Sequence, residues 1–261
     1  MGFTKTEQEL AGYYELGARR FVGARMLAVM FTTKEEIVAR LLPPPLAPDD
    51  MPRGMMFIAE YPETNLGPGY RESALFIGCK YEGEAGNYCL SMPIQSEESR
   101  LANGRDIFGF PKKAATIHYK EDGDTVTGWV ERGGIRFVEI KAKLMAEMPQ
   151  LPESGPNFLF KASPRIDLQP GFDGPVLLCR QKTDVVPQAI RVGSAEVTLQ
   201  ASYQDPWAEV ELVDVIVAAH LVTDNTMQPG KVLTEVDGES FLPYYFKMTD
   251  FISGKPEGGA K

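Results

Sequence analysis

Short runs of alternating apolar and polar side chains in the middle of the chain predict a β meander. Three such runs span residues 113–120, 125–132 and 135–144. Polar turn residues at 121–124 and a glycine pair at 133–134 separate them. Because successive side chains of a strand point to opposite faces, these runs predict three antiparallel strands joined by tight turns.

Similar runs occupy most of the remaining chain. Residues 73–81 and 87–94 flank the turn residues 82–86, which indicates a β-hairpin. Further strands are predicted at residues 25–32, 175–186, 194–202 and 208–224. Turns that recur every 8–12 residues or so between short β-branched runs are typical of an antiparallel sandwich or barrel. The predicted fold class is therefore mainly β (α+β).

A few short helices accompany the predicted strands. One is expected within residues 6–21 and another over residues 96–103. The helix with the clearest signals follows Thr33, which can cap it, and Glu36 completes a capping box three residues later. Prolines at 43–45 end this helix, because proline cannot continue its hydrogen bonds.

Composition and charge narrow the class of protein. The 261 residues show no internal repeat or linker, so we predict one domain over residues 1–261, with 1–20 and 252–261 peripheral. The net charge is −9, whereas nucleic acid or an anionic membrane attracts clustered Lys and Arg. No apolar run reaches the roughly 18 residues of a membrane span, and no secretion signal begins the chain. Three cysteines suggest a reducing compartment. We therefore expect a cytoplasmic protein with neither nucleic acid nor membrane as its partner.

This sequence has few of the residues that several common kinds of catalytic and binding site require. The chain has two histidines, His118 and His220, which leaves few ligands for a zinc site and few bases for a Ser-His-Asp triad. It has no GxGxxG segment and no P-loop, so nucleotide binding has little support. We expect neither a metal nor a cofactor.

A pair of lysines stands out because it follows an apolar stretch. Lys112 and Lys113 end the segment GRDIFGFPKK, residues 104–113. At pH 7 a lysine of pKa about 10.4 is neutral in roughly one molecule in 2,500, and only the neutral amine attacks a carbonyl. Burial in an apolar site lowers that pKa by up to about 3–4 units and would make the amine a competent nucleophile. The alternative interpretation is two solvated lysines at the end of a strand.

This segment, with others in the same order, resembles the acetoacetate decarboxylase family. That family carries a Gly-Arg-Glu/Asp stretch, a short aromatic segment and then Pro-Lys-Lys, which here is Pro111 followed by the two lysines. Within roughly residues 20–235, the further similar segments are ARMLAVMFTTKEEIVARLLPPPLAPDD (24–50), GYRESALFI (69–77), PNFLFK (156–161) and VELVDVIVAAHLVTDNTMQPGKVL (210–233). The resemblance implies antiparallel sheets that form a barrel-like or cone-shaped cavity with a few peripheral helices, and a homo-oligomer.

Carried over by motif, the resemblance implies roles for particular residues. Lys112 matches the lysine that forms a Schiff base with a β-keto acid, and Lys113 matches its neighbour. The protonated imine withdraws electrons, so CO2 leaves, and protonation and hydrolysis of the remaining enamine release a ketone. Arg25 matches an active-site arginine that would hold the substrate carboxylate with its planar fork. Glu72 matches a glutamate that would orient this arginine or move a proton.

Strand alternation qualifies the choice between the two lysines. Adjacent side chains of a strand point to opposite faces, so Lys112 and Lys113 cannot both enter one pocket without a bulge. This favours burial over repulsion from Lys113 as the cause of a lowered pKa. The Lys113 face continues with Ala115, Ile117 and Tyr119, and the Lys112 face with Ala114, Thr116 and His118. Alternation alone favours Lys113 as the apolar-facing lysine, and the family motif favours Lys112.

One departure from the family pattern affects the predicted reaction. Without gaps, Phe57 stands where the family has a second acidic residue upstream of Glu72. The leading prediction is a lyase that decarboxylates an acetoacetate-like β-keto acid through a Schiff base and releases CO2 and a ketone. One alternative is a Schiff-base aldolase or dehydratase that acts on α-keto acids such as pyruvate. A non-catalytic ligand-binding barrel is the other alternative.

Overall fold

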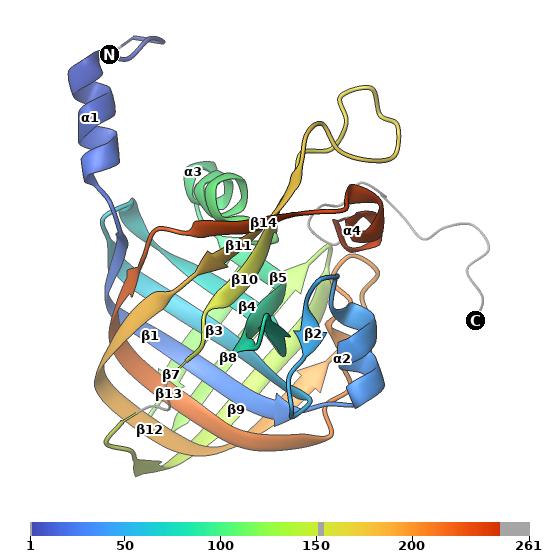
Figure 1. The fold of residues 1–261 in the computed structure, drawn as a ribbon. Coiled ribbons are helices and arrows are strands. Elements are labelled where there is room, and N and C mark those ends of the chain that lie inside the picture. The colour runs from blue at the N-terminus through green and yellow to red at the C-terminus, as the bar shows by residue number, and fades with distance from the viewer. Residues whose placement is uncertain (1, 151–153, 246–261) are drawn as a thin grey trace.

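The computed structural model describes residues 2–150 and 154–245, most of which form one large curled β-sheet (Figure 1). The strands are β1 (Arg19–Thr32), β2 (Ala47–Pro48), β3 (Arg53–Thr64), β4 (Gly67–Tyr81), β5 (Glu84–Gln95), β6 (Lys112–Ala114), β7 (Thr116–Asp122), β8 (Thr125–Arg132), β9 (Ile135–Glu147), β10 (Asn157–Lys161), β11 (Val176–Gln181), β12 (Thr183–Leu199), β13 (Asp214–Met227) and β14 (Lys231–Val236). The helices are α1 (Glu7–Glu15), α2 (Glu35–Leu41), α3 (Glu98–Ala102) and α4 (Gly238–Tyr245), with a π-helical segment at Asn103–Phe108 and a 3-10 turn at Trp207–Glu209.

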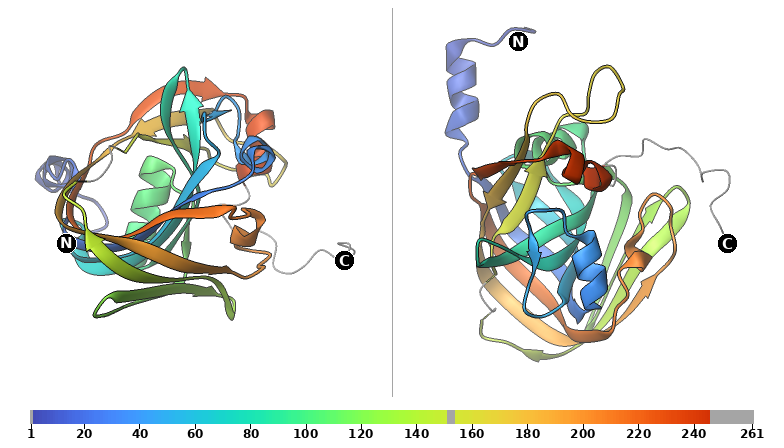
Figure 2. Two further views of the ribbon diagram at one scale, coloured as in Figure 1. Left: turned by 90° about the horizontal axis from the view of Figure 1, so that it is seen from below. Right: turned by 45° about the vertical axis from the view of Figure 1, so that its right-hand side comes forward.

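The strands are hydrogen-bonded in the order β14-β11-β10-β5-β4-β3-β1-β13-β12-β9-β8-β7. The short strands β2 and β6 pair with β4 and β5. Most pairs are antiparallel, and β5 pairs in parallel with β6 and β10. The sheet is not closed, but it curves round like the wall of a barrel when seen from below (Figure 2). The predicted mainly β fold is confirmed, including the meander of β7, β8 and β9.

The helices lie at the periphery of the sheet, and the start of α2 corrects one prediction. Helix α1 has the complete capping box of Thr6 and Glu9. The capping box predicted for α2 is wrong, because that helix has Lys34 at its N-cap and no side-chain cap. Thr33 instead donates its backbone N–H to Pro52 O at 2.9 Å, so it extends the strand pairing. The segment predicted to be peripheral at residues 252–261 lies outside the described residues.

The sheet buries apolar side chains on both of its faces. One cluster includes Phe21, Ala28, Phe57, Tyr70 and Phe76. The other includes Leu27, Phe31, Ile58, Leu75 and Phe137. These sets alternate along β1, β3 and β4, as strand geometry requires. We call the side of the first cluster the Glu72 face and the side of the second the Arg25 face, after a charged residue on each.

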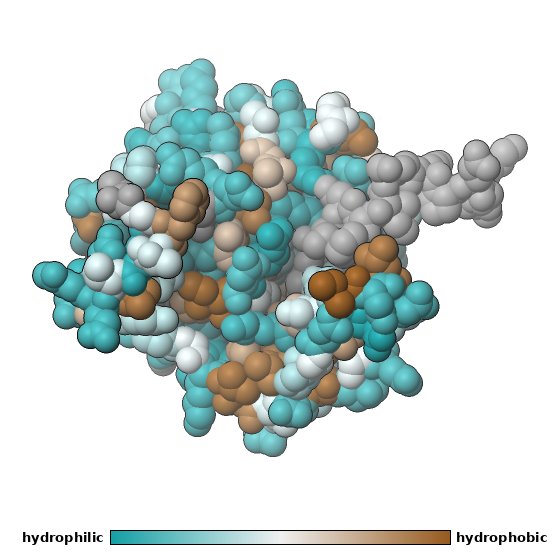
Figure 3. Space-filling model, turned by 90° about the horizontal axis from the view of Figure 1, so that it is seen from above, coloured by the Kyte–Doolittle hydropathy of each residue, from teal (hydrophilic) through white to brown (hydrophobic). Residues whose placement is uncertain are grey.

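The outer surface fits the acidic, polar composition. Seen from above, it is mostly hydrophilic with small separate hydrophobic patches (Figure 3). Within the described part of the chain, no helix is long and apolar enough to cross a membrane. The same residues contain no cluster of three or more His, Cys, Asp or Glu side chains arranged to hold a metal ion.

Candidate active site

Lys112 and Glu72 meet in the interior, on the Glu72 face. Lys112 begins β6 and Glu72 lies in β4, and the strand between them, β5, pairs with both. The Lys112 Nζ donates a hydrogen bond to the Glu72 Oε2, and each side chain is only 7% exposed. A lysine and a carboxylate in direct contact can exchange a proton, which an ammonium group must lose before it attacks a carbonyl.

Two tyrosines stand beside this contact. Tyr61 and Tyr70 are directly opposite one another on β3 and β4, with ring centroids 5.0 Å apart. The Lys112 Nζ lies 5.9 Å from the centroid of the Tyr70 ring. Burial raises the pKa of both tyrosines well above the ordinary value, and the negative charge of Glu72 raises it further. Their hydroxyl groups therefore stay protonated and can donate hydrogen bonds at neutral pH.

The segment before Lys112 leaves space for the lysine stem and is held against β5. The predicted end of the third helix at 103 is wrong, because a π-helical segment continues to residue 108. Gly104 in this segment lies against the lysine stem, and a Cβ there would stand 2.1 Å from the Lys112 Cε. The Pro111 carbonyl accepts the Met92 N–H at 3.2 Å and so fixes the segment to β5. Such π-helical insertions are frequent at functional sites.

Lys113 points to the Arg25 face, as strand alternation predicts. Its Nζ donates a hydrogen bond to Gln204 O at 2.7 Å and lies 4.0 Å from the Asp205 Oδ1. Burial lowers the pKa of Lys113 to about 8, an effect that Asp205 opposes and Arg132 reinforces. A cavity of about 330 Å³ adjoins this lysine. The interpretation as two solvated lysines is wrong, because Lys112 and Lys113 are 5% and 7% exposed.

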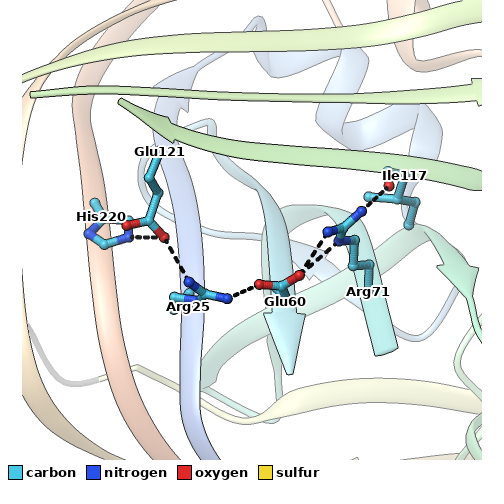
Figure 4. Close-up of polar contacts among 6 residues, drawn as sticks. All are labelled: Arg25, Glu60, Arg71, Ile117, Glu121 and His220. Atoms are coloured by element: carbon cyan, nitrogen blue, oxygen red, sulfur yellow. Dashed lines mark hydrogen bonds and ion pairs between the residues drawn. The ribbon is translucent and has the colours of Figure 1, made fainter. Parts of the chain in front are cut away.

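Arg25 does not share the Lys112 site, which corrects the placement expected from its motif. Its guanidinium pairs with Glu60, which also accepts hydrogen bonds from Arg71 at 2.8 and 3.0 Å (Figure 4). Glu121 lies 3.8 Å from Arg25 and 3.4 Å from His220 in the same network. All of these groups lie on the Arg25 face.

Strand register explains why Arg25 is separated from Glu72. Arg25 is directly opposite Glu60 on β3, whereas Glu72 is opposite Ala59, the next residue back along that strand. Adjacent residues of a strand face opposite sides of the sheet. On β1 the Glu72 face is occupied by Ala24, which is fully buried, and by Met26.

Phe57 faces the same side of the sheet as Glu72. It lies between Ala28 and Ala74 in the register and stacks on Phe76 with ring centroids 6.1 Å apart. The acidic residue nearby in sequence, Glu60, points to the other face. This wall of the site is therefore apolar at the position where the family pattern has an acid.

Sequence reasoning missed several residues of the site. Tyr61 and Tyr70 are paired across β3 and β4, and the position of Tyr70 two residues before Glu72 on β4 could have indicated that both face the same side. In the sequence, Gly104 indicated only the end of a helix and not a contact with Lys112. Arg100, which is 4% exposed and has its guanidinium 5.8 Å from the Tyr70 ring centroid, gave none at all. The two tyrosines come near Lys112 only through the pairing of strands that are distant in sequence.

The fold and this site can now be set beside known proteins. The family model described as acetoacetate decarboxylase (ADC) matches residues 4–236. The chain belongs to the acetoacetate decarboxylase family. The resemblance drawn from the Pro-Lys-Lys motif and its accompanying segments is therefore confirmed.

Curated relatives support the same assignment over most of the chain. It is 28% identical over 229 residues to the acetoacetate decarboxylase of Burkholderia multivorans, which covers 84% of this chain and 90% of the relative. It is 30% identical over 227 residues to acetoacetate decarboxylase 2 of Mesorhizobium japonicum, with 84% and 85% covered. These relatives support a lyase similar to acetoacetate decarboxylase.

Solved structures show the same fold. The crystal structure of acetoacetate decarboxylase from Legionella pneumophila matches with a TM-score of 0.74 and 23% identity, covering 84% of this chain and 88% of that one. The enduracididine biosynthesis enzyme MppR in complex with pyruvate matches with a TM-score of 0.72 and 17% identity, covering 84% and 91%. The fold is thus shared by an acetoacetate decarboxylase and by an enzyme of enduracididine biosynthesis.

Proposed function

We propose that this protein decarboxylates an acetoacetate-like β-keto acid through a Schiff base on Lys112. The observation that carries this proposal is the buried contact between the Lys112 Nζ and the Glu72 carboxylate, in a chain of the acetoacetate decarboxylase family. A buried amine with a proton acceptor in direct contact and an apolar wall is the combination that imine formation needs.

The steps can be assigned to the residues of the site. Glu72 takes a proton from the Lys112 ammonium, and the freed lone pair of Nζ attacks the keto carbon. The carbonyl oxygen collects two protons and leaves as water, which gives a protonated imine. The bond to the carboxylate then breaks, its electron pair passes into the imine, and CO2 and a neutral enamine result. Both protons of that water come from the Lys112 ammonium, one of them through Glu72, so Glu72 takes up a further proton from solvent and passes it to the enamine carbon before water hydrolyses the imine.

The apolar wall formed by Phe57 and its neighbours supports decarboxylation. The carboxylate of the substrate loses its negative charge as CO2 forms, so the transition state carries less localised charge than the bound substrate. An apolar wall therefore suits the neutral CO2 that forms better than it suits a carboxylate, which needs a paired cation while it is bound. Phe57 is 6% exposed and lies on the face of Glu72.

A direct assay tests this function. The purified protein is incubated with acetoacetate, and released CO2 and acetone are measured beside the Lys112→Met variant. We expect turnover by the natural protein and loss of turnover in the variant. Release of CO2 at the same rate by both proteins would remove Lys112 from the mechanism.

A second candidate function is a Schiff-base aldolase or dehydratase that acts on an α-keto acid. It is favoured by the likeness to MppR, which was solved with pyruvate, and by Phe57 in place of the acid in the family pattern. In this case pyruvate and borohydride would give an adduct on Lys112, and acetoacetate would release no CO2 above the uncatalysed rate. A non-catalytic barrel would give neither adduct nor CO2.

We also propose that the protein works as a homo-oligomer. Helix α1 buries none of its residues and projects from the sheet (Figure 1). It exposes Leu10, Tyr13 and Tyr14, which are 45%, 43% and 75% accessible. Contact with a second copy of the chain would remove this apolar surface from water. Light scattering on the natural protein, beside a chain that lacks residues 1–16, tests this part of the proposal.

A further inference from the structure

Because Arg25 lies on the opposite face, it cannot bind a substrate carboxylate on the Glu72 face, as its motif had led us to expect. A carboxylate next to Lys112 needs a donor on that face, because burial of an unpaired charge is unfavourable. Ala24 and Met26, the residues of β1 that face this side, provide no charge. The group that binds the substrate carboxylate must therefore lie on another helix or strand.

Arg100 of α3 is a buried cation on the same side of the protein. Its side chain is 4% exposed, and its guanidinium Cζ lies 5.8 Å from the centroid of the Tyr70 ring. The Lys112 Nζ lies 5.9 Å from the same centroid. Both cations thus lie within 6 Å of the centroid of one ring, and the positive charge of Arg100 opposes the burial that raises the pKa of Tyr70.

Two of the donor atoms of Arg100 have no hydrogen-bond partner among the described residues. Nη1 donates to the Ser96 Oγ at 3.2 Å and lies 3.5 Å from the Glu97 carboxylate. Nε and Nη2 are buried and have no hydrogen-bond partner among the described residues. Buried donors of a charged group are rarely left unpaired in native proteins. Nε and Nη2 are also the pair that binds the two oxygens of a carboxylate in parallel.

Neighbouring residues hold this fork in place. Ser96 and Glu97 hold Nη1, so the guanidinium cannot rotate freely about its stem. Gly67 at the turn between β3 and β4 leaves room for the fork, since a Cβ there would stand 2.9 Å from Nη2. A fixed, desolvated fork binds an anion with less loss of conformational entropy than an exposed arginine.

We propose that the Nε and Nη2 atoms of Arg100 bind the carboxylate of the keto-acid substrate while Lys112 engages its carbonyl. Arg100 takes the place that the sequence motif assigned to Arg25. This inference rests on the proposed Schiff base at Lys112. It specifies that the substrate class is a carboxylate-bearing carbonyl compound, held by one bidentate contact. The guanidinium remains charged throughout and exchanges no proton.

The test compares a charged and a neutral probe in Arg100→Met. Acetoacetate or acetone is incubated with the full chain, the imine is reduced with borohydride, and the adduct on Lys112 is quantified by peptide mapping. Methionine keeps the apolar stem and removes the fork. We expect the apparent affinity for acetoacetate to fall roughly 10- to 100-fold, the loss typical of one charged hydrogen-bonding contact, while the acetone adduct is unchanged. Arg100→Lys should recover part of the affinity.

Arg25→Met serves as the matched control, because it removes a guanidinium from the opposite face. It should leave both adducts unchanged. Equal trapping of acetoacetate by Arg100→Met and the natural protein would overturn the inference and leave the Schiff base intact. Equal loss of both adducts in Arg100→Met would also overturn it, because the role would then be structural. Failure of the proposed function itself is distinct, since the natural protein would then form no adduct with either probe.

Discussion

The Lys112 Nζ donates a hydrogen bond to the Glu72 Oε2 between two strands that are not neighbours in the sheet. Both side chains are 7% exposed, and Phe57 and Tyr70 are among the residues buried on the same face. A buried ion pair of this kind adds little net stability, because removal of the charges from water offsets their attraction. Its presence in the interior is therefore better explained by chemistry than by folding.

Removal of one charge of the Lys112–Glu72 pair should lower the free energy of unfolding far more than removal of both. Glu72→Leu leaves the Lys112 ammonium buried without a counter-charge, and we expect the free energy of unfolding to fall by about 3–5 kcal/mol. The double variant Lys112→Met, Glu72→Leu should recover most of that loss. Urea unfolding of the four proteins in the cycle measures the effect. Glu211→Gln, which breaks the exposed pair with Lys34, is the control and should show no comparable loss. Additive losses from the two buried substitutions would contradict this account.

Gly104 should be required for the position of the catalytic amine. A methyl group at this residue would stand 2.1 Å from the Lys112 Cε, so Gly104→Ala must displace the lysine stem. We expect the rate of decarboxylation to fall about 10- to 100-fold, because a small misplacement of a reacting group is costly in rate. Gly12→Ala provides a reference for adding a Cβ without a clash, since nothing lies within 4 Å of that position. Unchanged kcat in Gly104→Ala would show that the amine tolerates displacement.

Arg25 should be dispensable for chemistry. It lies on the face opposite Glu72 and pairs with Glu60, with 43% of its side chain exposed. Arg25→Met should therefore change kcat and KM for acetoacetate by no more than about twofold, as expected of a partly exposed residue away from the site. A large rise in KM for this variant would restore the role that the motif suggested.

Lys113 should make stability depend on pH in the alkaline range. Its pKa is lowered from 10.5 to about 8 in the folded protein, so between these values the unfolded chain binds a proton that the folded chain does not. The free energy of unfolding contributed by this group therefore rises with pH across that window. Relative to Lys113→Met, the natural protein should gain roughly 3 kcal/mol between pH 8 and pH 10.5. Chemical denaturation at several pH values measures this difference, and a constant difference would contradict the lowered pKa.

Local patterns in the sequence predicted a large part of the fold. The meander, the hairpin at 82–86 and the opposite directions of Lys112 and Lys113 all follow from a period of two and from turn residues. The π-helical segment was not predictable in this way. Asn103 and Gly104 have the composition of a helix end, and the helical turns continue because later residues fix them to β5.

The placement of Arg25 shows where such patterns are insufficient. Both faces of β1 are apolar, with Ala24, Met26 and Ala28 on one face and Leu27 and Val29 on the other. The pattern therefore does not indicate which face carries the site. A bulge at Gly23, whose φ is +61°, also shifts the register with β13. Only the pairing with Glu60 assigns Arg25 to its face, and this contact spans 35 residues of sequence.

Trapping of the imine tests the central claim most directly. The natural protein is incubated with acetoacetate, reduced with borohydride and mapped by tandem mass spectrometry, which separates modification of Lys112 from that of Lys113. The account predicts an isopropyl group on Lys112, the mark of a substrate that lost CO2 before reduction. No adduct with acetoacetate, or an adduct on Lys113 alone, would contradict it.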